Sequence, residues 1–344
     1  MKYDAILIVS FGGPEGMDEV MPFLDNVLRG RNVPLERKKE VARHYEKFGG
    51  VSPINDNNCK LIAALQDALA KTGLDLPIYW GNRNWHPLLE DTVKRMADDG
   101  IKNAIAFVTA AYGSYSSCRQ YQEDIERARM AVGSAAPQID KLRLFFNHPL
   151  FIEANAQNVL AVMDSLEPQC REKAELLFTA HSIPLPMARA CSYQQQIEET
   201  GRLIADRIGV KQWELAFQSR SGPSSQPWLD PDIFEYISLC AAEGTKDLVV
   251  LPVGFLADHM EVMYDIDYEA KEFATENGVR LHRVETVGVH PKFIEMIIEL
   301  IGERAGLTEP RYIGSFGAAP DVCAVECCPA TAVGQMRPAS VHTD

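Results

Sequence analysis

Short apolar runs alternate with amphipathic stretches along most of the chain. The apolar runs predict strands at 5–10, 77–80, 104–108 and 142–146, and again at 176–179, 214–218, 248–252 and 280–284. The amphipathic stretches predict helices at 17–28, 35–47, 57–71, 87–98, 118–132, 149–165, 192–207, 230–242, 259–276 and 291–304. Such alternation is typical of parallel sheets with helices on both faces. We therefore predict an α/β protein with two similar domains, each built on a parallel four-stranded sheet, and a cleft between them.

The composition changes near the C-terminus. After Gly306 the chain becomes rich in proline, alanine and glycine and loses its periodicity. We predict a first domain at 1–148, a second at 149–306 that begins with a bridging helix, and a tail at 307–344. Such a tail should be loosely ordered unless something ties it down.

Size and charge narrow the possible partners. The chain has 344 residues, 46% of them hydrophobic and 24% charged, which is typical of a globular protein. The net charge of −14 argues against nucleic acid or an anionic membrane as a main partner and is compatible with attraction of metal cations. The chain enters a strand at once without a basic leader, and its apolar runs are too short for a transmembrane segment. We expect a cytoplasmic protein and a monomer.

Acidic residues follow the strand predicted at 248–252. We predict that Asp258 caps the next helix, with Glu261 as its capping-box partner. Glu261, Asp265 and Glu269 then recur every fourth residue, so they share one stripe of that helix. Like charges at this spacing cost about 0.2–0.5 kcal/mol per pair. The stripe is either a solvated helix face or a path for a cation. Ligand sites of open α/β sheets lie at the carboxyl ends of strands, and the position of the stripe after such an end favours the cation path.

The strand predicted at 176–179 leads to His181. A single histidine is often only a structural residue, but this one is predicted at the same sheet edge as the acidic helix. Histidine near carboxylates can act as a base close to neutral pH or as a metal ligand.

The cysteines divide into scattered residues and one cluster. The eight are Cys59, Cys118, Cys170, Cys191, Cys240, Cys323, Cys327 and Cys328. Scattered cysteines of a cytosolic protein are usually reduced core residues, whereas the three in the tail favour a metal. Iron–sulfur clusters and structural zinc usually take four ligands, and Cys118, just beyond a predicted strand, is the candidate fourth. The alternative is that the tail thiols bind nothing.

Several stretches together resemble the ferrochelatases over nearly the whole chain. They are FGGP at 11–14, RGR at 29–31, YEKFGGVSP at 45–53, FTAHSIP at 178–184, QSRSGP at 218–223, PWL at 227–229 and DHME at 258–261. The resemblance implies two Rossmann-like domains with a porphyrin held in the cleft between them. It also implies insertion of Fe²⁺, as substrate, into that porphyrin.

The resemblance also implies roles for individual residues. It makes His181 and Glu261 the catalytic pair, with Asp265 and Glu269 continuing the acidic line that receives iron. It makes four cysteines the ligands of a [2Fe–2S] cluster found in some members, although the tail spacing here differs from the usual one: Cys118, Cys323, Cys327 and Cys328. The candidate porphyrin-binding residues are Arg29, Tyr45 and Ser52, as propionate contacts, and Phe11, where some coproporphyrin enzymes carry a tyrosine.

The sequences of residues 115–118 and 220–228 resemble most the actinobacterial branch of the ferrochelatases, which works on coproporphyrin III. The expected reaction is therefore coproheme formation in haem biosynthesis. Two alternatives stay open: the same reaction on protoporphyrin IX, and a non-catalytic haem or metal carrier with the same cleft.

Overall fold

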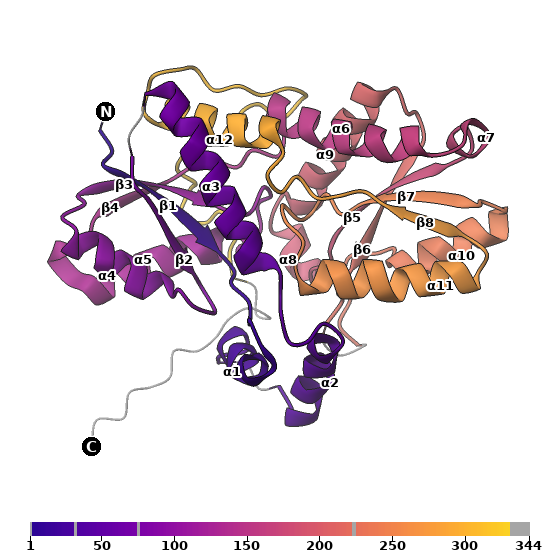
Figure 1. Ribbon diagram of the computed structural model, residues 1–344, viewed down its shortest axis with the longest axis horizontal. Coiled ribbons are helices and arrows are strands. Elements are labelled where there is room, and N and C mark those ends of the chain that lie inside the picture. The colour runs from indigo at the N-terminus through magenta and orange to yellow at the C-terminus, as the bar shows by residue number, and fades with distance from the viewer. Residues whose placement is uncertain (1, 31–32, 74–75, 222–224, 331–344) are drawn as a thin grey trace.

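The computed structural model describes residues 2–30, 33–73, 76–221 and 225–330. Within these ranges the strands form two parallel sheets of four strands, in the orders β2-β1-β3-β4 and β6-β5-β7-β8 (Figure 1). The first sheet contains β1 (Ala5–Ser10), β2 (Ile78–Asn82), β3 (Asn103–Val108) and β4 (Gln138–Lys141). The second contains β5 (Glu175–His181), β6 (Trp213–Gln218), β7 (Asp247–Leu251) and β8 (Arg280–Arg283). The predicted α/β class with two similar sheets is confirmed.

Most helices fall close to the predicted stretches, while the short α7 and α8 lie outside them and the helix predicted at 259–276 is divided between η3 and α11. They are α1 (Met17–Val27), α2 (Leu35–Glu46), α3 (Ile54–Thr72), α4 (Leu89–Asp98), α5 (Gln120–Val132), α6 (Pro149–Ser165), α7 (Pro168–Arg171), α8 (Leu185–Arg189), α9 (Tyr193–Ile208), α10 (Ile233–Glu243), α11 (Lys271–Glu276) and α12 (Pro291–Arg304). Two wide, π-type helices, η1 (Tyr115–Arg119) and η3 (Val262–Ala270), precede α5 and α11, and η2 (Gly133–Ala135) is a 3₁₀ turn. No helix in the described ranges has the length and apolar character needed to cross a membrane.

Alternate residues of the first sheet pack in two layers. On one face, Leu7 and Val9 of β1 pack with α4 and α5. On the other face, Ile6 and Ile8 share a core with α3 and with α12, a helix that follows the second sheet in the chain. Figure 1 shows α12 beside α3 above the first sheet. The two halves therefore share one apolar core, while the predicted domain boundaries stay a prediction.

The second sheet is covered in the same way. Phe178 and Leu251 face α6 and α9 within the shared core. Leu177 and Val250 face α10, η3 and α11. Because β5 lies between β6 and β7, all of its residues between Glu175 and His181 are buried. This arrangement fixes the carboxyl ends of β5 and β7 beside each other.

Helices α1 and α2 lie apart from the first sheet and contact the second half (Figure 1). Phe23 and Tyr45 pack in a small cluster with Tyr264 of η3 and with Met260, which lies just before it. The imidazole of His44 stacks on the Tyr264 ring with 3.7 Å between ring centroids. Aromatic contacts therefore join α1, α2 and η3, and the predicted cleft at this junction stays a prediction.

The strand predicted at 142–146 is wrong. The edge strand β4 covers Gln138–Lys141 instead, and the Leu142 amide makes the next hydrogen bond, to the Ala106 carbonyl. The following residues are apolar because they enter the shared core, where Phe145 is buried. Arg143 leaves the sheet to pair with Glu303 of α12, with 2.7 Å between Nε and Oε2.

The tail from 307 to 330 has no helix or strand in this described part, yet it is anchored. The Ile313 amide donates to the Asn147 carbonyl at 3.0 Å, and the Phe316 ring packs edge-on against Phe146. Farther along, Arg119 of η1 donates to the Val325 carbonyl at 3.0 Å. The tail therefore crosses back to the first half, while residues 331–344 lie outside the described ranges.

Candidate active site

The carboxyl ends of β5 and β7 bring His181 and the acidic helix together. Phe178 pairs with Leu251, the last residue of β7, so His181 lies just beyond that end. The turn after β7 leads to η3 and its carboxylates. The distance from His181 Nε2 to Glu261 Oε1 is 3.7 Å. The structure therefore brings together the two residues that the sequence singled out for catalysis.

The hydrogen bonding of His181 prepares its outer nitrogen to accept a proton. Nδ1 contacts the carbonyl oxygen of Ser182, which can only accept, so Nδ1 carries the hydrogen. In the neutral ring, Nε2 then has a free lone pair, and Nε2 faces Glu261. The Tyr193 hydroxyl donates to the His181 carbonyl at 3.1 Å and holds the end of the strand.

The three acidic residues remain neighbours along η3. Asp265 lies between Glu261 and Glu269, and the charges of both raise its pKa. Burial is the largest cause, and together these effects raise the pKa of Asp265 to about 7. The Ser219 hydroxyl donates to the Asp265 carboxylate and opposes the shift. A partly buried carboxylate with acidic neighbours is suited to a divalent cation that replaces its proton.

The predicted capping box at Asp258 is wrong. Its carboxylate binds Arg283 of β8 through two hydrogen bonds, at 3.0 and 2.7 Å, and accepts a third from Thr286 at 3.1 Å. The His259 ring takes the capping role instead, because its Nδ1 accepts from the Glu261 amide at 3.2 Å. A two-pronged bond to a guanidinium is stronger than one bond to a backbone amide, which explains the choice.

Two of the porphyrin-binding candidates lie next to this site. Phe11, 37% exposed at the end of β1, meets Phe23 edge-on, and Phe23 meets Tyr45 in the same way. Tyr45 packs in one cluster with Met260, the residue before Glu261, and burial and then the charge of Glu261 raise the pKa of Tyr45. Apolar and aromatic contacts thus run from Phe11 to the residue before Glu261.

The other two candidates lie differently. Arg29 is exposed just beyond α1, and its Nη2 donates to Asn26 Oδ1 at 2.6 Å. Ser52 is 5% exposed and packs against Gly13, where an added Cβ would come within 2.7 Å of the Ser52 Cβ. Their roles in porphyrin binding stay a prediction.

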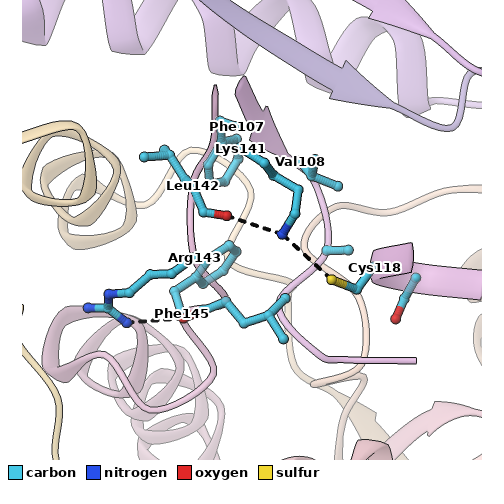
Figure 2. A pocket seen from close by; sticks show the side chains of 10 residues that line it. Phe107, Val108, Cys118, Lys141, Leu142, Arg143 and Phe145 are labelled. Carbon is cyan, nitrogen blue, oxygen red and sulfur yellow. Dashed lines mark hydrogen bonds between the residues drawn. The ribbon is translucent and has the colours of Figure 1, made fainter. Parts of the chain in front are cut away.

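The four predicted cluster cysteines lie close together. Contact with the Cys323 thiol and then burial raise the pKa of Cys118, and the Sγ atoms of Cys327 and Cys328 are 3.7 Å apart. Figure 2 shows Cys118 with the Lys141 ammonium, whose Nζ lies 3.6 Å from its sulfur. In the described residues, no group of three or more His, Cys, Asp or Glu side chains is arranged around a single metal ion. Within the described residues, Cys327 and Cys328 are in direct sulfur–sulfur contact.

Sequence reasoning missed Ser219 and Tyr193. Ser219 has a left-handed backbone with φ of 61°, which no residue pattern predicts for a serine. Its place in the stretch 218–223 was the only available signal. Tyr193 acts through a tertiary contact.

The fold is that of the chelatases. The cobalt complex of the sirohydrochlorin chelatase SirB from Bacillus subtilis subspecies spizizenii matches 89% of this chain and 96% of its own, with a TM-score of 0.52 and 15% identity. The Fe³⁺ form of SirB from Bacillus subtilis matches 90% of this chain and 99% of its own, with a TM-score of 0.53 and 15% identity. These likenesses establish the fold class.

Sequence comparison then gives the family. The ferrochelatase family model matches residues 3–305. A ferrochelatase from Rhodopirellula baltica is 52% identical, covering 95% of this chain and 93% of its own. The coproporphyrin III ferrochelatase of Nocardia farcinica is 47% identical over 99% of both chains, and that of Streptomyces coelicolor is 46% identical over 99% of this chain and 96% of its own. The chain belongs to the ferrochelatase family, the enzymes that insert iron into a porphyrin.

Proposed function

We propose that this ferrochelatase inserts Fe²⁺ into coproporphyrin III and so makes coproheme. The proposal is supported by the similarity to the Nocardia and Streptomyces relatives. Both are coproporphyrin III ferrochelatases, and both align with 99% of this chain. The alternative substrate is protoporphyrin IX. Both porphyrins lose two pyrrole N–H protons when Fe²⁺ binds the four nitrogens, so the same residues serve either reaction.

His181 and Glu261 are the proposed proton acceptors. The free lone pair on His181 Nε2 faces the same space as the Glu261 carboxylate, 3.7 Å away. One pyrrole proton passes to the imidazole and the other to the carboxylate or to water. The products are the iron porphyrin and two protons, and no electron is transferred.

Asp265 and Glu269 are proposed to deliver iron along η3 to Glu261. Their oxygens replace the water ligands of the ion one by one. In the metal-free protein the pKa of Asp265 is about 7, so Fe²⁺ displaces a proton there near neutral pH. Phe11 and Tyr45 are the proposed walls for the macrocycle. Arg29 is a proposed propionate partner because it is exposed, whereas the burial of Ser52 favours an indirect role through the turn at Gly13.

We also propose that Cys118, Cys323, Cys327 and Cys328 hold a [2Fe–2S] cluster. Such a cluster takes four thiolate ligands, and the proposal is supported by these four thiols being close enough to influence one another's pKa. Metal–sulfur bonds of about 2.3 Å at a tetrahedral metal place two sulfurs roughly 3.8 Å apart, close to the 3.7 Å between Cys327 and Cys328. A bound cluster would supply a crosslink between the tail and η1. We also propose that the protein is a cytoplasmic monomer. Light scattering of the purified protein tests the oligomeric state.

The test compares iron insertion into the two porphyrins under anaerobic conditions. We expect faster insertion into coproporphyrin III, and a His181→Ala rate lower by about 100-fold or more, because positioned bases contribute 10²–10⁴-fold. Glu261→Gln should also be slow, while its matched control Glu272→Gln, exposed on α11, keeps the wild-type rate. Faster turnover of protoporphyrin IX would reject the proposed substrate, and a folded His181→Ala protein with full activity would reject the proposed base.

A further inference from the structure

The start of the tail binds a buried carboxylate of α12. Arg143 donates to both oxygens of Glu303, at 2.7 and 3.2 Å, so a two-pronged bond holds this carboxylate. Glu303 Oε1 also accepts from the Arg311 amide at 2.8 Å, and Arg143 donates to the Arg311 carbonyl at 2.8 Å. The Arg143 and Glu303 side chains are 3% and 5% exposed. This buried ion pair therefore binds both the donor and the acceptor of one residue of the tail.

A second carboxylate, on α9, repeats this arrangement farther along the tail. Arg202 donates to both oxygens of Glu199, at 2.8 and 3.0 Å. Glu199 Oε1 then accepts from the Ser315 amide at 2.9 Å. Gly314 has a left-handed backbone with φ of 81°, and a Cβ on it would overlap with the same carboxylate oxygen. Glycine at this position therefore lets the tail approach Glu199 closely.

Between these two carboxylates the tail is bound through its main chain. The Ile313 amide donates to the Asn147 carbonyl at 3.0 Å, and the Asn147 side-chain amide donates to the Gly317 carbonyl at 2.7 Å. Asn147 is fully buried. Main-chain hydrogen bonds to partners that are already in place are how many folded proteins bind extended peptides. We call residues 311–317 the strap.

The strap lies beyond the part of the chain that the ferrochelatase family model matches, which ends at residue 305. The strap contacts named above involve carboxylates, amides and carbonyls, and none of them needs a thiol or a metal. Farther along the tail, Arg119 of η1 donates to the Val325 carbonyl at 3.0 Å. Val325 lies between Cys323 and Cys327, and Arg119 follows Cys118 in the chain. The strap therefore leads the tail thiols to η1.

We propose that the strap docks on the rest of the chain without any metal, and that this docking brings the tail cysteines to Cys118 before iron and sulfide bind. The second part rests on the proposed [2Fe–2S] cluster, whereas the first part does not. The two arginine–carboxylate pairs fix each other's geometry, so the site for the strap is preorganised. Thiols that are already held near η1 then lose less chain entropy when they bind iron.

The first experiment separates docking from metal binding. A protease-cleavage sequence inserted after Glu309, in the exposed stretch before the strap, allows the tail of the full-length protein to be cut. Cleavage is done with a chelator and a thiol reductant present, and iron analysis checks that the protein is metal-free. Gel filtration then shows whether the tail stays bound. We expect nearly all of the wild-type tail to remain, and its release would overturn the proposal.

Two glycines of the strap provide matched variants. Gly314→Ala places a Cβ against Glu199, whereas a Cβ at Gly317, which also has a left-handed backbone with φ of 71°, meets nothing within 4 Å. Backbone strain is therefore common to both variants. We expect cut Gly314→Ala protein to lose most of its tail and cut Gly317→Ala protein to keep it. Equal retention of the tail by the two variants would show that the contact with Glu199 does not hold the strap.

The second experiment tests the placement of the thiols in uncut protein. Iron and sulfide are added to metal-free protein without oxygen, and visible absorption and acid-labile sulfide follow cluster formation. We expect Gly314→Ala to form the cluster several-fold more slowly than the wild type, and Gly317→Ala to form it at the wild-type rate. Circular dichroism checks that each variant is folded.

The outcomes of the second experiment separate the two proposals. Equal rates for the wild type and Gly314→Ala would overturn the placement of the thiols by the strap. A wild-type protein that keeps its cut tail but forms no cluster would overturn the [2Fe–2S] proposal and leave the docking of the strap established.

Discussion

Asp265 is the residue whose chemistry depends most on its neighbours. Burial and the charges of Glu261 and Glu269 raise its pKa, whereas the hydrogen bond from Ser219 and the His181 ring lower it, and the result is about 7. The carboxylate is ionised above that pH and protonated below it. A divalent ion therefore competes with a proton at this position near neutral pH.

Ser219→Ala tests this balance. Ser219→Ala removes the hydrogen bond that the hydroxyl donates to the ionised Asp265 carboxylate. The pKa of Asp265 should therefore rise from about 7. We expect the acid limb of the kcat/KM profile for iron to move to higher pH, with a larger loss of rate at pH 6.5 than at pH 8.5. The control Ser221→Ala, at an exposed neighbouring residue, should leave the profile in place. An unchanged profile in Ser219→Ala would show that Asp265 does not limit the reaction.

For single residues, the sequence could predict a place in the candidate site when that place depends only on the residue's position along a strand or helix. His181 ends a strand, and Glu261, Asp265 and Glu269 follow a helical spacing, so their neighbourhood could be predicted. Asp258 was assigned wrongly because Arg283, 25 residues later, competes for its carboxylate.

Among the elements, the turn after β7 presses closely on β5. A Cβ added to Gly254 would lie 2.6 Å from the Ala180 Cβ and 2.7 Å from the Ala180 Cα. The Gly254 amide also donates to the Thr179 carbonyl at 3.0 Å. Ala180 immediately precedes His181, so the absence of a side chain at Gly254 lets η3 begin next to the proposed base.

Gly254→Ala should destabilise the protein and slow iron insertion. Overpacking a tight contact typically costs about 1–3 kcal/mol, and here it would also move His181 away from Glu261. Urea denaturation gives the change in the free energy of unfolding, and the insertion assay gives the change in rate. In contrast, Gly302→Ala in α12 should cost much less, because its Cβ would meet only the exposed Thr308 side chain, at 3.3 Å, and alanine favours a helix more than glycine. Equal stabilities for the two variants would contradict this account of the turn.

Apolar periodicity predicted most elements because buried parallel strands are continuously apolar. The prediction failed at β4, because this edge strand, QIDK, has only one apolar residue. The apolar residues that follow it enter the core, and they were predicted as the strand instead. The wide turns of η1 and η3 carry no periodic signal of their own. Their residues look like ordinary helix in the sequence.

For the whole molecule, the decisive contact is α12 on the first sheet. Arg143 and Glu303 form a nearly buried pair there, and Phe293 packs with Phe107 and Phe145. The sequence shows that α12 has an apolar face, but no sequence pattern predicts which sheet that face covers. Because α12 follows the second sheet in the chain, the prediction assigned it to the second domain.

A fragment of residues 1–148 should therefore fail to fold on its own. Without α12, the described part of the fragment covers the face that carries Ile8 and Phe107 only with α3 and the segment around Phe145. We expect no cooperative thermal transition by circular dichroism and strong binding of a hydrophobic dye. Co-expression with 149–344 should restore a folded complex. A cooperative melt of the isolated fragment would contradict the shared core.

The place of α12 in the chain also sets an order during synthesis. The ribosome releases the first sheet early, yet the helix that completes its core is the last helix described, and Cys323, Cys327 and Cys328 follow later still. Domains usually fold as they emerge, N-terminal first. Here one apolar face of the earliest strands stays incompletely covered until α12 has been synthesised. A chain that stops before α12 therefore cannot complete the core of its first sheet.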